Sequence, residues 1–380
     1  MRSAAEAVKA VPEHQIYSAA VVCKERELEE LCTCLGPLLE PRTSFARPDF
    51  FLASISRGVW KPRIVAVKQR GELVGALYAK ERRVAGISTG IIYGDATLAG
   101  MVTAKASFRG AVFYAAVDAL LRRRTTLGLR LLLPPDSYEV QMLESLVRQH
   151  NVDYTTAPAE NHVLLPLGHT YDEFLGRLGP RTRRNFRYYR RKFELDGSAY
   201  VEDVPMAEFR MAAETLLRQK VVGADREGVA RAFAMFAQAR KPILTGLRDK
   251  NGNWLSLLGG WFEDGRPIIF FQMNSDKHHS RSSLCLVLRG YFFERLISSG
   301  IRNVIFWAGV GEPLNRCSTP IPTVSVYIDK RQLLWSGFRS AIASGMRRLP
   351  REMAWRADWI VPNSRSGAQS GAADIAMEAE

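Results

Sequence analysis

The chain has few cysteines and no long apolar run. Its 380 residues include five cysteines, an odd number, and none of them form a Cys-x-x-Cys pair. This usage argues against a disulfide framework and indicates a reducing compartment. The N-terminus lacks the apolar core of a signal peptide, and no segment reaches the roughly 20 apolar residues that a membrane-spanning helix needs. The sequence therefore predicts a cytoplasmic protein without a transmembrane segment.

Several motifs that bind common cofactors or carry catalysis are also missing. The chain has no Gly-x-x-x-x-Gly-Lys-Ser/Thr loop, so a nucleoside triphosphate site of that kind has no support. The six histidines lack metal-ligand spacing, and no metal is predicted. Gly86–Gly90 reads Gly-x-Ser-x-Gly, but the residues after it continue as a strand where a hydrolase needs a helix. After Gly309–Gly311, Leu314 occupies the place of the third glycine of a dinucleotide loop.

The composition is that of a globular protein with an excess of positive charge. Apolar residues make up 47% and charged residues 24%, and the length fits two domains better than one. Lys and Arg number 53 against 39 Asp and Glu, a net charge of +14 that favours anionic ligands. The tail from about residue 363 has no aromatic residues, and we expect it to be disordered.

Hydrophobic periodicity predicts the same order of elements in both halves of the chain. In the first half we expect helices at 26–39, 110–123 and 138–150, and strands at 63–68, 72–80, 87–93 and 129–133. In the second half we expect helices at 183–193, 206–220, 229–239, 282–298 and 332–348, and strands at 243–248, 254–263, 267–273, 303–307 and 323–328. Each half thus reads as meander, helix, strand, helix. This order indicates an α/β fold present twice, over residues 1–165 and 166–350, with an extension at 351–380.

A strongly basic segment opens the second half. Residues 181–192 hold seven cations, and Pro180 stands at the helix entrance, where its missing donor costs nothing. An apolar stripe at helical spacing faces the core, while Arg183, Arg187 and Arg191 line up at i, i+4 and i+8. Like charges at that spacing repel each other, which favours an anionic partner. The alternative is a solvated helix face.

Four stretches, in order, are similar to a known family. They are Thr43-Ser44-Phe45 with Pro48-Asp49-Phe50-Phe51; the hairpin 63–80 with Gly71-Glu72-Leu73-Val74-Gly75; Tyr171-Asp172-Glu173-Phe174-Leu175 with Arg183-Arg184-Asn185; and strand 303–307 with its glycine turn. This pattern resembles the CelD/BcsL-type acetyltransferases of the GNAT superfamily, which are related to the Fem-type aminoacyl transferases of peptidoglycan synthesis. The resemblance implies tandem GNAT-like domains, each a mixed central sheet with a strand meander flanked by helices.

The resemblance also implies a donor site and an anion site. Acyl coenzyme A, with acetyl coenzyme A first among the acyl forms, is expected between splayed strands, its pyrophosphate at the N-terminus of the following helix. The residues expected at that N-terminus are His279, Ser280, Arg281, Ser282 and Ser283. The residues expected to bind an anionic substrate group are Arg181, Arg183, Arg184, Asn185, Arg187, Arg191 and Asn315.

Acyl transfer from a thioester needs a base for the acceptor and a proton for the leaving thiolate. Glu312, in the turn after strand 303–307, is the first candidate base, followed by Asp276 and His278. Tyr327 is a candidate proton donor. The family commonly has a Tyr-Lys pair after the glycine turn, and this chain departs from that pattern with Leu314-Asn315.

These features predict an acyl-coenzyme-A-dependent N- or O-acyltransferase acting on a sugar or amine in envelope or polysaccharide metabolism. Peripheral membrane contact through the helix at 332–348 stays open. Three alternatives also remain: a Fem-like aminoacyl transferase using charged tRNA, a non-enzymatic nucleic-acid-binding protein, and a family member without activity.

Overall fold

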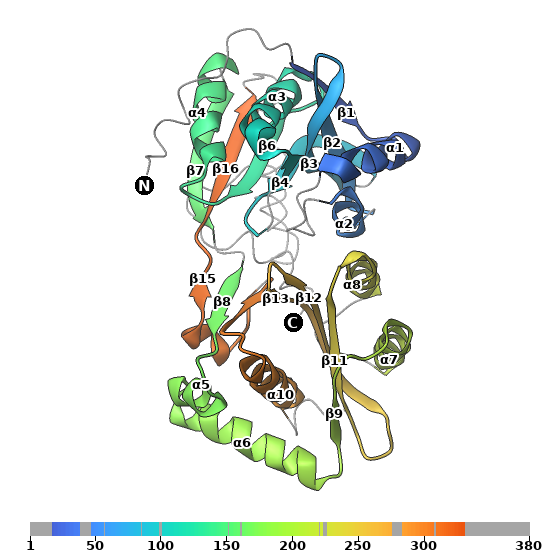
Figure 1. Ribbon diagram of the computed structural model, residues 1–380, viewed down its shortest axis with the longest axis vertical. Helices are drawn as coiled ribbons and strands as arrows, with labels where there is room; N and C mark the ends of the chain where they lie inside the picture. The colour runs from blue at the N-terminus through green and yellow to red at the C-terminus, as the bar shows by residue number, and fades with distance from the viewer. Residues whose placement is uncertain are drawn as a thin grey trace, which may run out of the picture. The chain divides into compact units, whose positions relative to one another are not determined.

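The computed structural model describes residues 17–38, 47–56, 58–84, 86–98, 101–150, 152–159, 162–219, 221–222, 226–275, 283–307 and 309–330. These residues form two compact units, and Figure 1 shows a central sheet in each. Unit 1 comprises described residues up to 159 together with 323–330, and unit 2 those between 162 and 322. The helix expected at 332–348 and the C-terminal tail lie outside the described residues.

Unit 1 is a mixed sheet with helices on both faces. Its strands run in the order β1-β2-β3-β4-β6-β16-β7, with β5 beside β3, and only β4 and β6 are parallel. The elements are β1 (Tyr17–Val22), α1 (Glu25–Leu35), η2 (Gly36–Leu38), α2 (Pro48–Ala53), β2 (Trp60–Gln69), β3 (Glu72–Val84), β4 (Ile87–Asp95), β5 (Val102–Ala104), η3 (Ala106–Phe108), α3 (Arg109–Arg122), β6 (Gly128–Leu133), α4 (Tyr138–His150), β7 (Val152–Ala159) and β16 (Thr323–Lys330).

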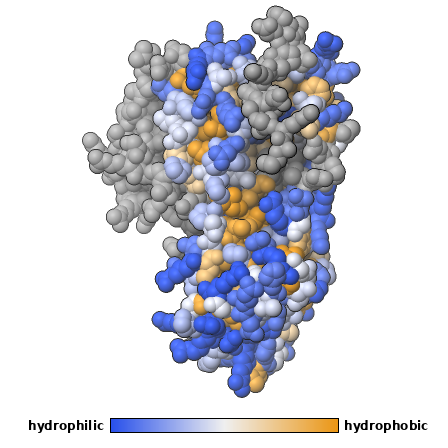
Figure 2. Space-filling view, turned by 60° about the vertical axis from the view of Figure 1, so that its left-hand side comes forward, coloured by the Kyte–Doolittle hydropathy of each residue, from blue (hydrophilic) through white to orange (hydrophobic). Residues whose placement is uncertain are grey.

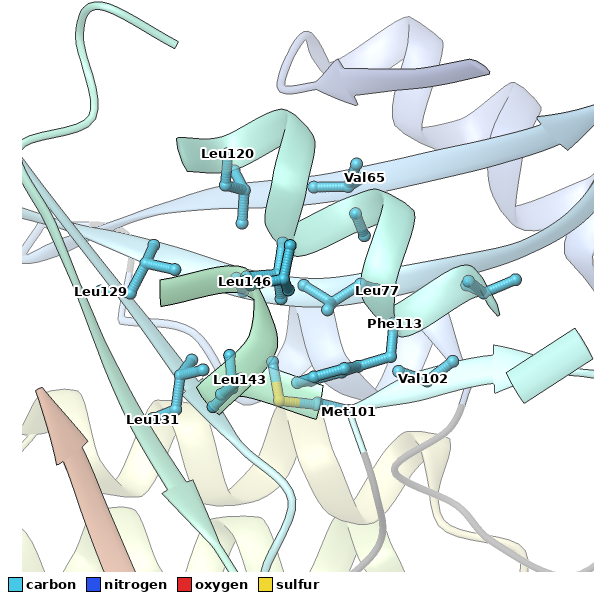
Figure 3. Close-up of a cluster of buried hydrophobic side chains, with 14 of the residues drawn as sticks. Val65, Leu77, Met101, Val102, Phe113, Leu120, Leu129, Leu131, Leu143 and Leu146 are labelled. Carbon is cyan, nitrogen blue, oxygen red and sulfur yellow. The ribbon is translucent and has the colours of Figure 1, made fainter. Parts of the chain in front are cut away.

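The core of unit 1 follows from alternation along β2. Val65 and Val67 face α3 and α4, whereas Ile64 and Ala66 pack with α1 on the other face. A strand covered on both faces is apolar on both, because successive side chains point in opposite directions. Figure 3 shows the larger of the two clusters, in which side chains of α3 and α4 meet those of the sheet.

Unit 2 repeats this architecture. Its strands run β15-β8-β14-β13-β12-β11-β9, with β10 beside β13. The elements are β8 (Val163–Pro166), α5 (Tyr171–Arg177), α6 (Pro180–Leu195), β9 (Ala199–Val201), α7 (Met206–Arg218), β10 (Val221–Val222), α8 (Arg226–Gln238), β11 (Pro242–Arg248), β12 (Trp254–Glu263), β13 (Arg266–Ser275), α10 (Leu284–Ser298), β14 (Asn303–Phe306), η4 (Leu314–Cys317) and β15 (Thr319–Pro320). Figure 1 shows α10 on one side of this sheet and α7 and α8 on the other.

The two sheets share one order of strands, which confirms the predicted tandem fold. Each has an antiparallel meander (β2-β3-β4 or β11-β12-β13) and a helix (α3 or α10). A strand parallel to the last meander strand (β6 or β14) follows, and then an antiparallel neighbour (β16 or β8). The tandem GNAT-like organisation inferred from the sequence pattern is therefore present as two sheets of the same topology.

One strand of unit 1 comes from the far end of the described chain. β16, predicted within the second domain, instead pairs with β6 and β7 of unit 1. β8, which was not predicted as a strand, pairs with β14 and is the first strand of unit 2. Local periodicity identifies a strand but not its partner, so the sequence did not reveal where β16 pairs. Tyr327, which lies on β16, consequently belongs to unit 1.

Candidate active site

The parallel strand pair is closed in unit 1 and open in unit 2. In unit 1, β4 pairs with β6 continuously from Ile91 to Asp95. In unit 2, β13 pairs with β14 only at Ile268 and Ile269, and the last bond is donated by the Trp307 amide to the Ile269 carbonyl, at 2.9 Å. β13 continues to Ser275. Only unit 2 therefore has a strand that runs on past its parallel partner.

A β-bulge lies where the two strands separate. Gly259 faces Phe271 and Gly260 faces Ile269, so Phe270 is an extra residue of β13 without a partner on β12. A bulge bends its strand and re-aims the side chains that follow. Gly260 is required here because a methyl group on it would lie 2.0 Å from the Ile268 carbonyl oxygen.

A short strand closes the far end of the opening. β10 pairs with Asn274 and Ser275 of β13. Because Asn274 also faces Ser256 on β12, β10 occupies the opposite edge, the one that β14 leaves. Between them, Phe270 to Met273 face no strand among the described residues on that edge. We call this segment the open edge.

On the α10 side, the open edge is crossed by one arginine. Arg289 donates from Nε to Gln272 Oε1 at 2.8 Å and from Nη1 to the Val310 carbonyl at 2.6 Å, and its guanidinium lies 5.1 Å from the Phe306 ring centre. Arg289 thus ties the segment after β14 to β13. The Gln272 Nε2 atom is buried, and no described residue accepts a hydrogen bond from it.

On the other side, aromatic rings cover the point of separation. Trp307 lies 5.7 Å from Phe270 and 6.0 Å from Trp261, measured between ring centres. His162, in the loop before β8, lies with its ring tilted against Trp307, 4.8 Å between ring centres, and donates from Nδ1 to the Trp307 carbonyl. The opening therefore has one apolar wall and one wall with polar hydrogen-bonding groups.

The predicted catalytic residues do not all gather here. Glu312 is exposed in the turn two residues after Val310 and pairs with Arg316 at 3.3 Å. Tyr327 lies instead in the sheet of unit 1, where the Arg130 guanidinium covers its ring at 5.1 Å. Glu312 and Tyr327 thus belong to different units. Asp276 and His278 lie outside the described residues.

The predicted donor-binding residues fall mostly outside the described residues, namely His279, Ser280, Arg281 and Ser282. Ser283 is the N-cap residue of α10. Its φ of 42° is left-handed, and its side chain makes no capping hydrogen bond. A non-glycine residue in this region is uncommon and is often found at functional sites.

The basic segment forms α6, with Pro180 in the first turn as predicted. Phe186 and Phe193 are buried against the core that includes α10. Arg190 is half-buried and donates to Glu294 at 2.7 Å and to Glu194 at 3.1 Å. These contacts hold α6 to α10.

The outward side of α6 differs from the predicted arginine line. Arg187 pairs with Asp172 at 3.0 Å, and Arg183 is partly buried. The exposed cations without a partner among the described residues are Arg181, Arg184, Arg191 and Lys192. Figure 2 shows mostly hydrophilic residues at the lower end of the molecule, where Figure 1 draws α6. Asn315 lies in η4, exposed.

Two ionisable groups between α6 and α10 have shifted pKa values. Tyr291 donates to Glu194 at 2.6 Å, and this hydrogen bond, with that from Arg190, lowers the pKa of the Glu194 carboxyl. Burial, and after it the neighbouring Glu194, together raise the pKa of Tyr291 to about 12. Both shifts favour the hydrogen-bonded pair in which Glu194 is charged and Tyr291 neutral.

Comparison with solved structures places the fold. L-PGS from Bacillus licheniformis is 12% identical over 81% of this chain and 92% of its own, with a TM-score of 0.50. FemX is 11% identical over 84% and 99%, also with a TM-score of 0.50. A tandem GNAT protein from the clavulanic acid biosynthesis pathway is 13% identical over 83% and 98%, with a TM-score of 0.43. The first two likenesses show a shared fold.

No protein-family model matches the chain, and no curated protein matches it either. Among the described helices, none is long and apolar enough to cross a membrane. Within the same residues, no three His, Cys, Asp or Glu side chains are grouped in a way that would hold a metal ion.

Proposed function

We propose that the chain is a GNAT-type acyltransferase whose donor lies along the open edge of β13. The observation that carries the proposal is the difference between the two units: β4 is paired with its parallel neighbour from Ile91 to its end at Asp95, whereas β13 runs past its parallel neighbour and offers Phe270 to Met273 to a ligand. Buried backbone groups rarely remain without partners, so an extended ligand with amide groups suits this edge. The pantetheine arm of acyl coenzyme A has that chemistry.

The residues around the open edge fit such a donor. The apolar wall formed by Phe270, Trp261 and Trp307 suits an acyl chain, and Gln272 offers a buried amide donor. The first amides of α10 follow β13 along the chain, and a helix N-terminus favours phosphate. Acyl coenzyme A would supply the acyl group as a thioester.

We further propose roles for two polar residues. Arg289 is a positioning residue, because it fixes the segment after β14 to β13 without itself needing to touch the donor. Glu312 follows two residues after the Val310 carbonyl that Arg289 binds, and its exposed carboxylate is the candidate base for an amine or hydroxyl acceptor. A sugar or amine of envelope or polysaccharide metabolism remains the acceptor class that we propose, in the cytoplasm.

One observation favours a second candidate, an aminoacyl transferase using charged tRNA. The exposed, unpaired cations of α6 are suited to a phosphate backbone. The resemblance to Fem-type transferases supports the same reading. In this alternative the open edge would hold the aminoacylated end of the RNA.

Hydrogen exchange tests the donor site within one molecule. We expect acetyl coenzyme A, or a longer acyl form, to slow exchange in peptides of unit 2 that cover β13 and the start of α10. Peptides that cover β4 in unit 1 should be unchanged, because that ladder is already complete. They serve as the internal control.

Two results would count against the proposal. If the acyl form binds and slows exchange in β4, the donor lies in unit 1 and not in unit 2. No binding of any acyl form would remove acyl coenzyme A as the donor, and a salt titration with generic RNA would then test the tRNA alternative. Binding that weakens steeply with salt would favour that alternative.

A further inference from the structure

Unit 2 has a groove between α7 and α8, on the face of the sheet opposite α10. Its volume is about 450 Å³, within the size range of small-molecule sites. The walls come from α7, between Arg210 and Arg218, and from α8, between Arg226 and Phe233. The groove is separate from the open edge, because none of its lining residues belongs to β13, β14 or α10.

The polar lining of the groove is predominantly cationic. Arg210, Arg218 and Arg226 line it together with Glu214, which gives three positive charges and one negative, a net of +2. All four side chains belong to exposed residues. Within the described residues, no ion pair joins any of the three arginines to an acid. The three arginines outnumber the one acid and repel one another, so an anion bound among them is stabilised.

The floor of the groove is apolar. It is formed mainly by Leu217, Val229 and Phe233, and the last two are 5% and 4% exposed. The Arg210 guanidinium lies 5.3 Å from the Phe233 ring centre, a cation–π contact that holds this arginine on the groove wall. A ligand that satisfies both floor and walls therefore has an apolar body and an anionic head.

The net positive charge of the groove lining favours a doubly charged anionic head group on the ligand. A phosphomonoester carries a charge of about −1.5 to −2 near neutral pH, which matches the net +2 better than a carboxylate does. Guanidinium groups bind phosphate oxygens in pairs of parallel hydrogen bonds.

We propose that the α7–α8 groove is a binding site for a small phosphomonoester with an apolar body. The site is independent of the donor and does not rest on the transferase activity. It lies near the open edge along the chain, because β10, in the connection between α7 and α8, pairs with Asn274 and Ser275 at the end of that edge.

Binding of n-hexyl phosphate below its micelle concentration tests the proposal by calorimetry on the full chain. We expect it to bind at least about 10-fold more tightly than hexanol or inorganic phosphate, since each of these lacks one of the two interactions, each worth about 1.4 kcal/mol or more. The double variant Arg218→Glu with Arg226→Glu should weaken binding at least about 10-fold, because it reverses two charges at the groove. Arg266→Glu, at the opposite end of β13, is the matched control and should bind as the wild type does.

The outcomes separate this site from the donor site. Equal binding of n-hexyl phosphate by the wild type and the double variant would overturn the proposal, as would no binding at low salt. Competition by acetyl coenzyme A would also overturn it, because the groove would then hold the phosphates of the donor. Binding of acetyl coenzyme A without competition, and unchanged in the double variant, would support two separate sites. An unchanged thermal melt shows that the double variant is folded.

Discussion

Substitution of Arg289 tests whether this side chain holds the two sides of the open edge of unit 2 together. The side chain makes two hydrogen bonds across the opening, one to Gln272 and one to the Val310 carbonyl. Hydrogen bonds from a charged donor contribute about 1.5 to 3 kcal/mol each, less where they are partly exposed. Arg289→Ala removes both and leaves the buried Gln272 amide group with neither partner. We expect unit 2 to lose about 2 to 4 kcal/mol of stability.

The assay must report on unit 2 alone, because a single melting curve would mix two units. Hydrogen exchange of peptides from β13 and from residues 309–317 gives local opening free energies. Gln272→Leu in the Arg289→Ala background should recover about 1 kcal/mol, because it removes the amide group left without partners. Transfer activity should fall together with the order of residues 309–317.

Arg295 on the same helix is the matched control. Its ion pair with Glu202 is 2.8 Å long, but the two side chains are 57% and 37% exposed. An exposed pair contributes about 0 to 1 kcal/mol, so Arg295→Ala should cost no more than that. A change of less than about 0.5 kcal/mol in Arg289→Ala, equal to the control, would refute the bridging role.

Three further changes test other parts of unit 2. The Glu194 carboxyl has a lowered pKa, so it stabilises the fold above its ordinary value of 4.5 and loses this effect as the pH falls. In Glu194→Gln, the free energy of unfolding should therefore decrease less between about pH 5 and pH 3 than it does in the wild type. Gly260→Ala should destabilise unit 2 by more than about 2 kcal/mol, whereas Gly176→Ala, with open space around the residue, should not. Equal thermal unfolding of the two variants would refute the requirement for glycine at the bulge. The double variant Arg184→Glu with Arg191→Glu should leave thermal unfolding unchanged but weaken binding of a short single-stranded RNA. Unchanged RNA binding would support the alternative, in which these arginines only face solvent.

Periodicity predicted most helices and strands of this fold. The helix α4 has the predicted bounds, 138–150, and the meander strands β11, β12 and β13 begin or end within two residues of their predicted positions. The missed elements are mostly short or lie at sheet edges: strands β1, β5, β7, β8, β9, β10 and β15 and helices α2 and α5 were not predicted. The strand β16 was predicted, but within the second domain, whereas it pairs in unit 1. Which strands become neighbours depends on contacts far apart in sequence, and no local pattern encodes them.

The candidate site was less predictable than the fold. The basic run on α6 stood out in the sequence, yet much of its charge faces solvent or pairs locally with Asp172, Glu194 and Glu294. Arg289 was missed because it lies in a helix that reads as apolar. A signal was present, since Arg289 is the only charged residue between Leu284 and Phe293. A single charge inside an apolar helix requires a partner, and that requirement identifies the site.

The position of one bulge accounts for the difference between the two units. In unit 1 the irregularity lies at the start of β4, where buried Glu81 accepts from the Gly90 amide at 2.8 Å and pairs with Arg63. The rest of β4 therefore stays in register with β6. In unit 2 the bulge lies at Phe270, and β14 ends its pairing there. Because an unpaired strand edge is costly unless something covers it, this difference between the units supports our proposal that a ligand pairs with the open edge.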